Sequence, residues 1–197
     1  MSPSTPEYWQ KVYDEEPRPG WDMDGPSPVL AELLDAAASR NISLGGEIAV
    51  PGCGFGHDAA ELVRRGFRVT AFDFVPTAIE GAKARYGDAV AWRLEDWFTT
   101  QEGPFDAIFD HTCFVAMDPA RREDYLDNCS SRLKPLGLWL AVLFDDTNGR
   151  LGPPFQIAMD EARSLTEARF EILHLQRAAR SHPRRAGREF LVIGRKK

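Results

Sequence analysis

Short apolar runs alternate with amphipathic segments along the chain, a pattern typical of strands that alternate with helices. Behind Ser27-Pro28, apolar residues recur at helical spacing and predict a helix over residues 28–40. Further helices are predicted over 57–65, 76–85, 119–134 and 158–168, and strands over 47–51, 67–72, 89–94, 105–109, 138–144, 170–175 and 189–194. This alternation of strands and helices indicates a doubly wound α/β fold with one seven-stranded, mostly parallel sheet whose last strand is antiparallel.

Two segments stand outside this alternation. Residues 1–27 are polar, acidic and interrupted by prolines, and we expect an irregular N-terminal segment there. Residues 145–155 are rich in glycine and proline and predict a loop. With 197 residues, 43% of them hydrophobic, the chain can build one substantial core, so we expect a single domain over 1–197.

Charge and cysteine content narrow the function classes. The 30 acidic and 24 basic residues give a net charge of -6, which argues against nucleic-acid or anionic-membrane partners. The longest strictly apolar run, Leu138 to Phe144, is far shorter than the ~20 residues of a membrane-spanning helix. Residues 1–21 lack the features of a secretory signal, and the cysteines (Cys53, Cys113 and Cys129) lack CxxC spacing. We therefore expect a cytoplasmic protein without disulfides or a structural metal.

A glycine-rich loop follows the first predicted strand, where Val50 is followed by Pro-Gly-Cys-Gly-Phe-Gly. Gly52 and Gly54 allow a sharp turn and let a ligand lie against main-chain N–H groups. Asp73, at the end of the second strand, is positioned to accept hydrogen bonds from both hydroxyls of a ribose. The Gly-x-Gly-x-Gly spacing favours S-adenosylmethionine over a dinucleotide. The structural alternative is a tight strand-to-helix turn with a capping aspartate.

A third motif, Glu95-Asp96-Trp97-Phe98, follows the third predicted strand. An acid there can accept a hydrogen bond from an adenine amino group while an aromatic ring covers the base. Taken alone, the tetrapeptide is more typical of an ordinary acidic loop with a buried aromatic residue.

Together these motifs resemble the Rossmann-like class I S-adenosylmethionine-dependent methyltransferases, and more closely the thiopurine, thiol and halide methyltransferase family. The residues that carry the resemblance are Trp9, Tyr13, 20–28, 50–54, 109–114, Pro119, Arg121 and 152–155. Val50, where most methyltransferases have an acid, is similar to this family. The chain departs from it at Asp24-Gly25-Pro26, where Gly-Arg-Pro is usual, and at Leu136, where glycine is common.

The resemblance implies S-adenosylmethionine as cofactor, S-adenosylhomocysteine as product, and a lid formed by residues 1–27. The implied cofactor-binding residues are Trp9, Trp21, Gly52, Cys53, Gly54, Asp73, Phe74, Glu95, Asp96, Trp97 and Asp110. The implied substrate-binding residues are Trp21, Phe114, Met117, Arg121, Pro154 and Phe155. The plainer alternatives are an N-terminal arm clasped onto the core and side chains that pack around loop ends.

The implied reaction is in-line methyl transfer to the sulfur of a small-molecule thiol or another soft nucleophile, with halide as the nearest alternative. Deprotonating a thiol of pKa near 8.5 costs roughly 2 kcal/mol at pH 7, whereas a phenol near pKa 10 costs about 4 kcal/mol. A thiol substrate therefore needs no general base. Asp110 and His111 are the nearest candidate catalytic groups, and the alternative for His111 is a structural hydrogen bond.

Other interpretations stay open at this point. Amine methyltransferases often carry Asn/Asp-Pro-Pro-Tyr/Phe where this chain has Asp110-His111-Thr112-Cys113, which disfavours an amine acceptor. Transfer to oxygen or nitrogen, a nucleotide-binding oxidoreductase and a noncatalytic binding domain are the remaining alternatives. The arginines between the last two strands (Arg177, Arg180, Arg184, Arg185 and Arg188) predict a solvated hairpin loop, with an anion-binding patch as the alternative. We expect a monomer or a small homo-oligomer.

Overall fold

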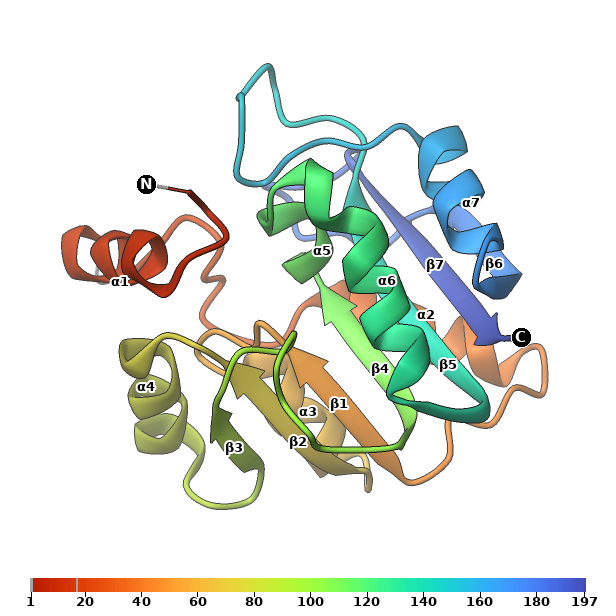
Figure 1. Ribbon diagram of the computed structural model, residues 1–197, viewed down its shortest axis with the longest axis horizontal. Coiled ribbons are helices and arrows are strands. Elements are labelled where there is room, and N and C mark those ends of the chain that lie inside the picture. The colour runs from red at the N-terminus through yellow and green to blue at the C-terminus, as the bar shows by residue number, and fades with distance from the viewer. Residues whose placement is uncertain (1, 17) are drawn as a thin grey trace.

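The seven predicted strands all form in the computed structural model, which describes residues 2–16 and 18–197. They are β1 (Glu47–Pro51), β2 (Arg68–Asp73), β3 (Ala91–Leu94), β4 (Phe105–His111), β5 (Leu133–Phe144), β6 (Phe170–Arg177) and β7 (Glu189–Lys196). One sheet contains them in the order β3-β2-β1-β4-β5-β7-β6 (Figure 1). Strands β1 to β5 pair in parallel, and β7 is antiparallel to both β5 and β6. The predicted doubly wound sheet with an antiparallel last strand is confirmed.

Helices cover both faces of the sheet because successive strand residues point to opposite sides. In β1, Ile48 and Val50 belong to one hydrophobic core and Ala49 belongs to the other. The first core is covered by α2 (Pro28–Ala38), α3 (His57–Arg64) and α4 (Pro76–Tyr86). The second is covered by α5 (Cys113–Ala116), α6 (Arg122–Ser131) and α7 (Met159–Glu167).

The N-terminal segment differs from the prediction, because it contains a helix. Residues Pro6–Glu15 form α1, which begins with a proline in its first turn and contacts α4. Its apolar side is made of aromatic rings, and of its residues only Tyr13 is buried. Apolar residues do recur at helical spacing here, at Trp9, Val12 and Tyr13, but the polar, acidic and proline-interrupted surroundings favour an irregular segment. Met1 and Pro17 of the expected lid lie outside the described residues.

The region before β5 also differs from the prediction. The helix expected over 119–134 is divided into a 3₁₀ turn at Pro119–Arg121 and α6, and α6 ends at Ser131. Strand β5 then begins at Leu133, earlier than predicted. Leu136 adopts a φ of 61° and is 68% exposed, so β5 starts with an irregular stretch that also contains proline and glycine. Such a stretch is not recognised as a strand from the sequence.

The strand order reverses between β1 and β4. From β1 the chain adds β2 and then β3 on one side, and it then returns to place β4 on the other side of β1. Ligands of open α/β sheets bind outside the carboxyl ends of the strands at such a switch point. The glycine loop, Asp73 and His111 all stand at this edge. Within the described part of the chain, no helix is long and apolar enough to cross a membrane.

Candidate functional site

The glycine loop after β1 is shaped by three left-handed residues. Gly52, Gly54 and Gly56 have φ angles of 58°, 53° and 78°. A Cβ on Gly52 would lie 2.8 Å from Sγ of Cys113, so the loop approaches the start of α5 too closely for any side chain. Burial raises the pKa of the Cys113 thiol well above its ordinary value, which keeps that thiol protonated and suits a packing role.

Asp73 joins the glycine loop to the start of α4. One carboxylate oxygen accepts the amide of Gly54 at 3.0 Å, and the other accepts the amide of Val75 at 3.0 Å. Burial raises the pKa of Asp73 to about 6, although these backbone N–H groups act in the opposite direction. The Asp73 carbonyl also accepts the amide of Glu95 at 3.1 Å. Backbone contacts thus bring the ends of β1, β2 and β3 together.

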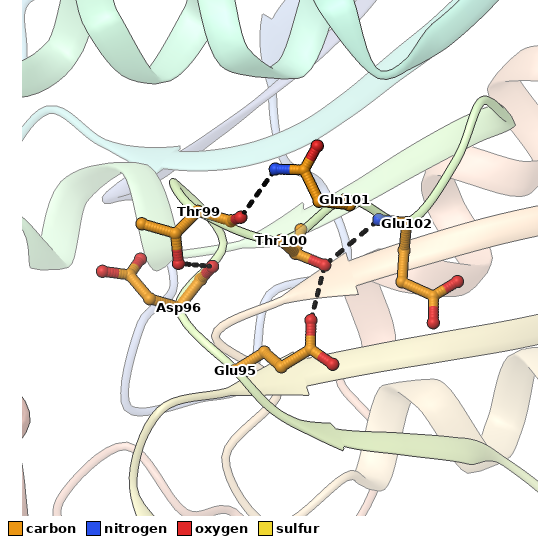
Figure 2. A pocket seen from close by; sticks show the side chains of 6 residues that line it. All are labelled: Glu95, Asp96, Thr99, Thr100, Gln101 and Glu102. Atoms are coloured by element: carbon orange, nitrogen blue, oxygen red, sulfur yellow. Dashed lines mark hydrogen bonds between the residues drawn. The ribbon is translucent and has the colours of Figure 1, made fainter.

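A polar hollow of about 480 Å³ lies beside the end of β3, and neither the glycine loop nor Asp73 lines it. It is lined by Glu95, Asp96, Thr99, Thr100, Gln101 and Glu102, which all come from the segment after β3 (Figure 2). The Thr100 hydroxyl donates to Glu95 at 2.6 Å, and one oxygen of Asp96 accepts the amide of Phe98 at 2.9 Å. The hollow therefore includes both acidic residues predicted for the cofactor, in a turn held by its own hydrogen bonds.

Trp97, predicted to bind the cofactor, lies mainly in the core. Its side chain is 4% exposed and packs edge-on against Phe72, with ring centroids 5.1 Å apart. The indole belongs to the core beneath the sheet edge, together with Phe105. The alternative reading of this tetrapeptide, a buried aromatic residue in an acidic loop, describes the observed geometry.

Aromatic rings connect α1 to the glycine loop. Trp9 contacts Trp21 at 5.3 Å between ring centroids, Trp21 contacts Tyr13 at 5.6 Å, and Tyr13 contacts Phe55 at 5.2 Å. Tyr13 is 5% exposed, and its hydroxyl would lie 3.4 Å from a Cβ on Gly54. Phe74 packs partly buried against the same cluster. The N-terminal segment therefore lies directly over the loop that is expected to bind the cofactor.

The predicted acceptor side is built on α5 and the loop after β5. Phe114 and Met117 are 1% and 7% exposed, so both are mainly core residues in this structure. The amide of Phe155 donates to the Val115 carbonyl at 2.6 Å, which brings the Pro153-Pro154-Phe155 turn against α5. The Arg121 guanidinium lies 3.8 Å from the centre of the Phe98 ring.

Asp110, a predicted catalytic and cofactor-binding residue, is fully buried with 0% exposure. Its carboxylate accepts the Tyr125 hydroxyl at 2.8 Å and the Phe114 amide at 3.2 Å. Burial raises its pKa to about 6, against the effect of these donors. The carboxylate thus links α5 and α6 to β4.

His111 makes hydrogen bonds through both ring nitrogens. Nδ1 lies 2.6 Å from Oδ2 of Asp58, and Nε2 lies 2.8 Å from Nη1 of Arg185. Arg185 is only 8% exposed, so the prediction that this arginine stands in a solvated loop is wrong. It is held inward by Glu189 at 3.3 Å and by the Trp21 carbonyl at 3.1 Å.

From the sequence, Arg185 is one of several loop arginines and Asp58 has no predicted role. Neither residue forms a local motif with His111, because 53 and 74 residues separate His111 from Asp58 and Arg185. The one available signal was the spacing of Arg185 and Glu189, which form an ion pair across a single turn.

Comparison with known proteins assigns the family. The chain matches the Thiopurine S-methyltransferase (TPMT) family over residues 4–192. It belongs to this family. Among relatives of this methyltransferase, the probable thiol methyltransferase 2 of Arabidopsis thaliana is 30% identical over 169 residues, covering 82% of this chain and 72% of that protein. A thiopurine S-methyltransferase of Aliivibrio salmonicida is 31% identical over 198 residues, covering 90% and 91%.

A solved structure shares the fold. It was determined in work on the conversion of a disulfide bond into a thioacetal group during echinomycin biosynthesis. Its TM-score to this methyltransferase is 0.80 at 21% identity, with 98% of this chain and 93% of that chain covered. The predicted family, the predicted enzyme class and its dependence on S-adenosylmethionine are thereby confirmed.

Proposed function

We propose that this methyltransferase transfers the methyl group of S-adenosylmethionine to the sulfur of a small-molecule thiol by in-line displacement. The observation that carries the proposal is that neither ionisable group at the end of β4 is free to act as a base. Asp110 is fully buried, and both ring nitrogens of His111 already have partners. A thiol can ionise without help for roughly 2 kcal/mol at pH 7, whereas phenols and protonated amines would require a base that is free to act.

The residues at the sheet edge fit the cofactor. The left-handed loop at Gly52 and Gly54 leaves no room for side chains near its backbone, which suits a ligand that lies against main-chain N–H groups. A carboxylate has about four lone-pair positions, and Asp73 uses two for backbone amides, so two remain for ribose hydroxyls. When bound, S-adenosylmethionine supplies an electrophilic methyl group on a cationic sulfur.

The aromatic cluster of the N-terminal segment serves as the lid in this proposal. The ring faces of Trp9 and Trp21 favour a nearby cation by roughly 0.5 to 2 kcal/mol, and the cluster excludes water from the reacting atoms. On the acceptor side, Met117, Arg121 and the turn at Pro154 and Phe155 form the wall that receives the thiol.

A panel of acceptors tests this function. Purified enzyme is incubated with S-adenosylmethionine and an aliphatic thiol, an aromatic thiol, iodide, a phenol or an amine, and methylated products are measured by mass spectrometry. We expect the thiols to react fastest, and kcat/KM should rise with pH through the pKa of each thiol itself. Methylation of the amine or phenol in preference to every thiol would overturn the proposal, and preference for iodide would assign halide as the acceptor.

A further inference from the structure

Four side chains from distant parts of the chain form a line at the end of β4. Asp58 comes from the first turn of α3, His111 ends β4, Arg185 lies in the loop between β6 and β7, and Glu189 begins β7. The side chains of His111, Asp58 and Arg185 are each 13% exposed or less, and Glu189 is fully buried. Asp58, His111, Arg185 and Glu189 together form the Arg185 line.

Hydrogen-bond chemistry fixes the proton on His111. An arginine guanidinium donates and cannot accept, so Nε2 of His111, at 2.8 Å from Arg185, must be the unprotonated nitrogen. Nδ1 therefore carries the proton and donates it to Asp58 at 2.6 Å. His57 has the opposite arrangement, since its Nε2 lies 2.9 Å from the carboxylate of Asp22 and donates to it.

The same guanidinium holds the N-terminal segment. Nη2 of Arg185 donates to the Trp21 carbonyl at 3.1 Å. Asp58, at the other end of the line, accepts the amide of Ser27 at 2.7 Å. The stretch from Trp21 to Ser27 is thus fastened at both ends by the groups that fix His111.

We propose that Arg185 is a positioning residue for methyl transfer. Its guanidinium holds His111 in the Nδ1–H tautomer and donates a hydrogen bond to the Trp21 carbonyl. One cation thus positions both the side chain at the end of β4 and the N-terminal lid. This proposal rests on the proposed function in one respect, namely that the N-terminal lid takes part in cofactor binding. By occupying Nε2, Arg185 also withholds this nitrogen from other partners.

The tautomer is tested on the unaltered enzyme by long-range proton–nitrogen NMR of the imidazole rings at pH 7.5. The chain has 4 histidines, and His111→Gln assigns the signal. We expect a pyrrole-type Nδ1 and a pyridine-type Nε2 for His111, with His57 as an internal contrast that carries its proton on Nε2. A His111 signal with the proton on Nε2 would overturn the proposal without reference to any acceptor.

The coupling to the lid is tested by the double variant Arg185→Met/Glu189→Gln, which removes the cation together with the carboxylate that would otherwise stay buried and unpaired. We expect the Nε2 signal of His111 to move away from its Arg185-bound position while Nδ1 stays protonated against Asp58. The Kd for S-adenosylhomocysteine, measured by calorimetry, should rise by about 10-fold, the scale of one charge-assisted hydrogen bond. Arg185→Lys, which keeps the charge without the planar fork, should recover only part of both effects.

Two controls separate the possible outcomes. Glu189→Gln alone retains Arg185 and should keep the Nε2 signal in its Arg185-bound position, and Arg180→Met removes an exposed arginine of the same loop that pairs with Asp35. Affinity in the double variant equal to that of Glu189→Gln would overturn the coupling, and so would loss of affinity without any change at His111. If thiols fail in the acceptor panel while both effects are observed, the thiol assignment fails and the role of Arg185 stands.

Discussion

At the scale of single residues, Asp73 connects the shape of the site to its chemistry. Its two oxygens hold the loop backbone at Gly54 and the start of α4, and the same oxygens face the edge where the ribose is expected. Because burial raises the pKa of Asp73 to about 6, its charge state changes close to neutral pH. One carboxylate therefore fixes the loop structure and, in the proposed function, also determines the affinity for the cofactor.

Cofactor affinity is predicted to depend on pH through this residue. The ionised carboxylate accepts from both ribose hydroxyls and the protonated form does not, so affinity should fall as the pH drops through about 6. Asp73→Asn should weaken S-adenosylmethionine binding by about 1 to 3 kcal/mol at pH 7.5 and flatten the pH dependence. Calorimetry from pH 5 to 8 measures both effects, and an unchanged slope in the variant would contradict this assignment.

Gly52 provides a second prediction at this scale. Gly52→Ala places a methyl group 2.8 Å from Cys113 in a left-handed backbone, so it should destabilise the fold by about 1 to 3 kcal/mol and reduce cofactor binding. The matched control is Gly149→Ala, which also has positive φ, at 73°, but open space around it. Urea unfolding of both variants isolates the contact, and equal losses of stability would show that Cys113 plays no part.

At the scale of elements, the attachment of α5 and α6 to the sheet depends on a buried carboxyl group. Asp110 receives Tyr125 from α6 and the Phe114 amide from α5, and both helices pack over the same face. The raised pKa of Asp110 means that the folded protein binds this proton more tightly than the unfolded chain does. Stability from this group is therefore complete below about pH 4 and is lost as the pH rises to about 6.

The prediction for Asp110→Asn follows from that sign. The difference in unfolding free energy between wild type and variant should shift by roughly 3 kcal/mol against the wild type as the pH rises from 4 to 7, because the variant has no proton to lose. Denaturant titrations at three pH values measure this difference. A constant difference across the range would show that the Asp110 carboxyl ionises in the folded state at its ordinary pKa.

The same scale shows how much the sequence predicts. The parallel strands were located within a few residues because each is a short, apolar run ended by glycine or a polar residue, as β1 is by Gly52. Helix α1 is not predicted because its apolar residues, such as Trp9 and Tyr13, stand in a polar segment interrupted by prolines. The glycine loop and Asp73 were found as local motifs, whereas the contacts of His111 with Asp58 and Arg185 join segments whose proximity depends on the finished sheet.

At the scale of the whole molecule, stability is distributed unevenly. Strands β4 and β5 lie in the middle of the sheet with nearly all of their residues buried or half-buried, whereas α1 lies outside the layers and contacts α4 (Figure 1). Segments with few buried contacts open most readily. The lid is therefore expected to move while the sheet stays intact.

Hydrogen exchange should show this difference directly. In the ligand-free enzyme, amides of α1 should exchange within seconds, while those of β4 and β5 remain protected for orders of magnitude longer. Addition of S-adenosylhomocysteine should slow exchange in α1 and leave the central strands unchanged. Equal protection of α1 and β5 without ligand would contradict the lid assignment.

The placement of β7 between β5 and β6 has a consequence for folding. In this sheet β6 pairs with β7, which follows it along the chain, so β6 can join the sheet only after β7 has docked against β5. Arg185, just upstream of β7, is brought to the Trp21 carbonyl by the same docking. A chain truncated before β7 would therefore lack both the pairing of β6 and the contact that holds Trp21.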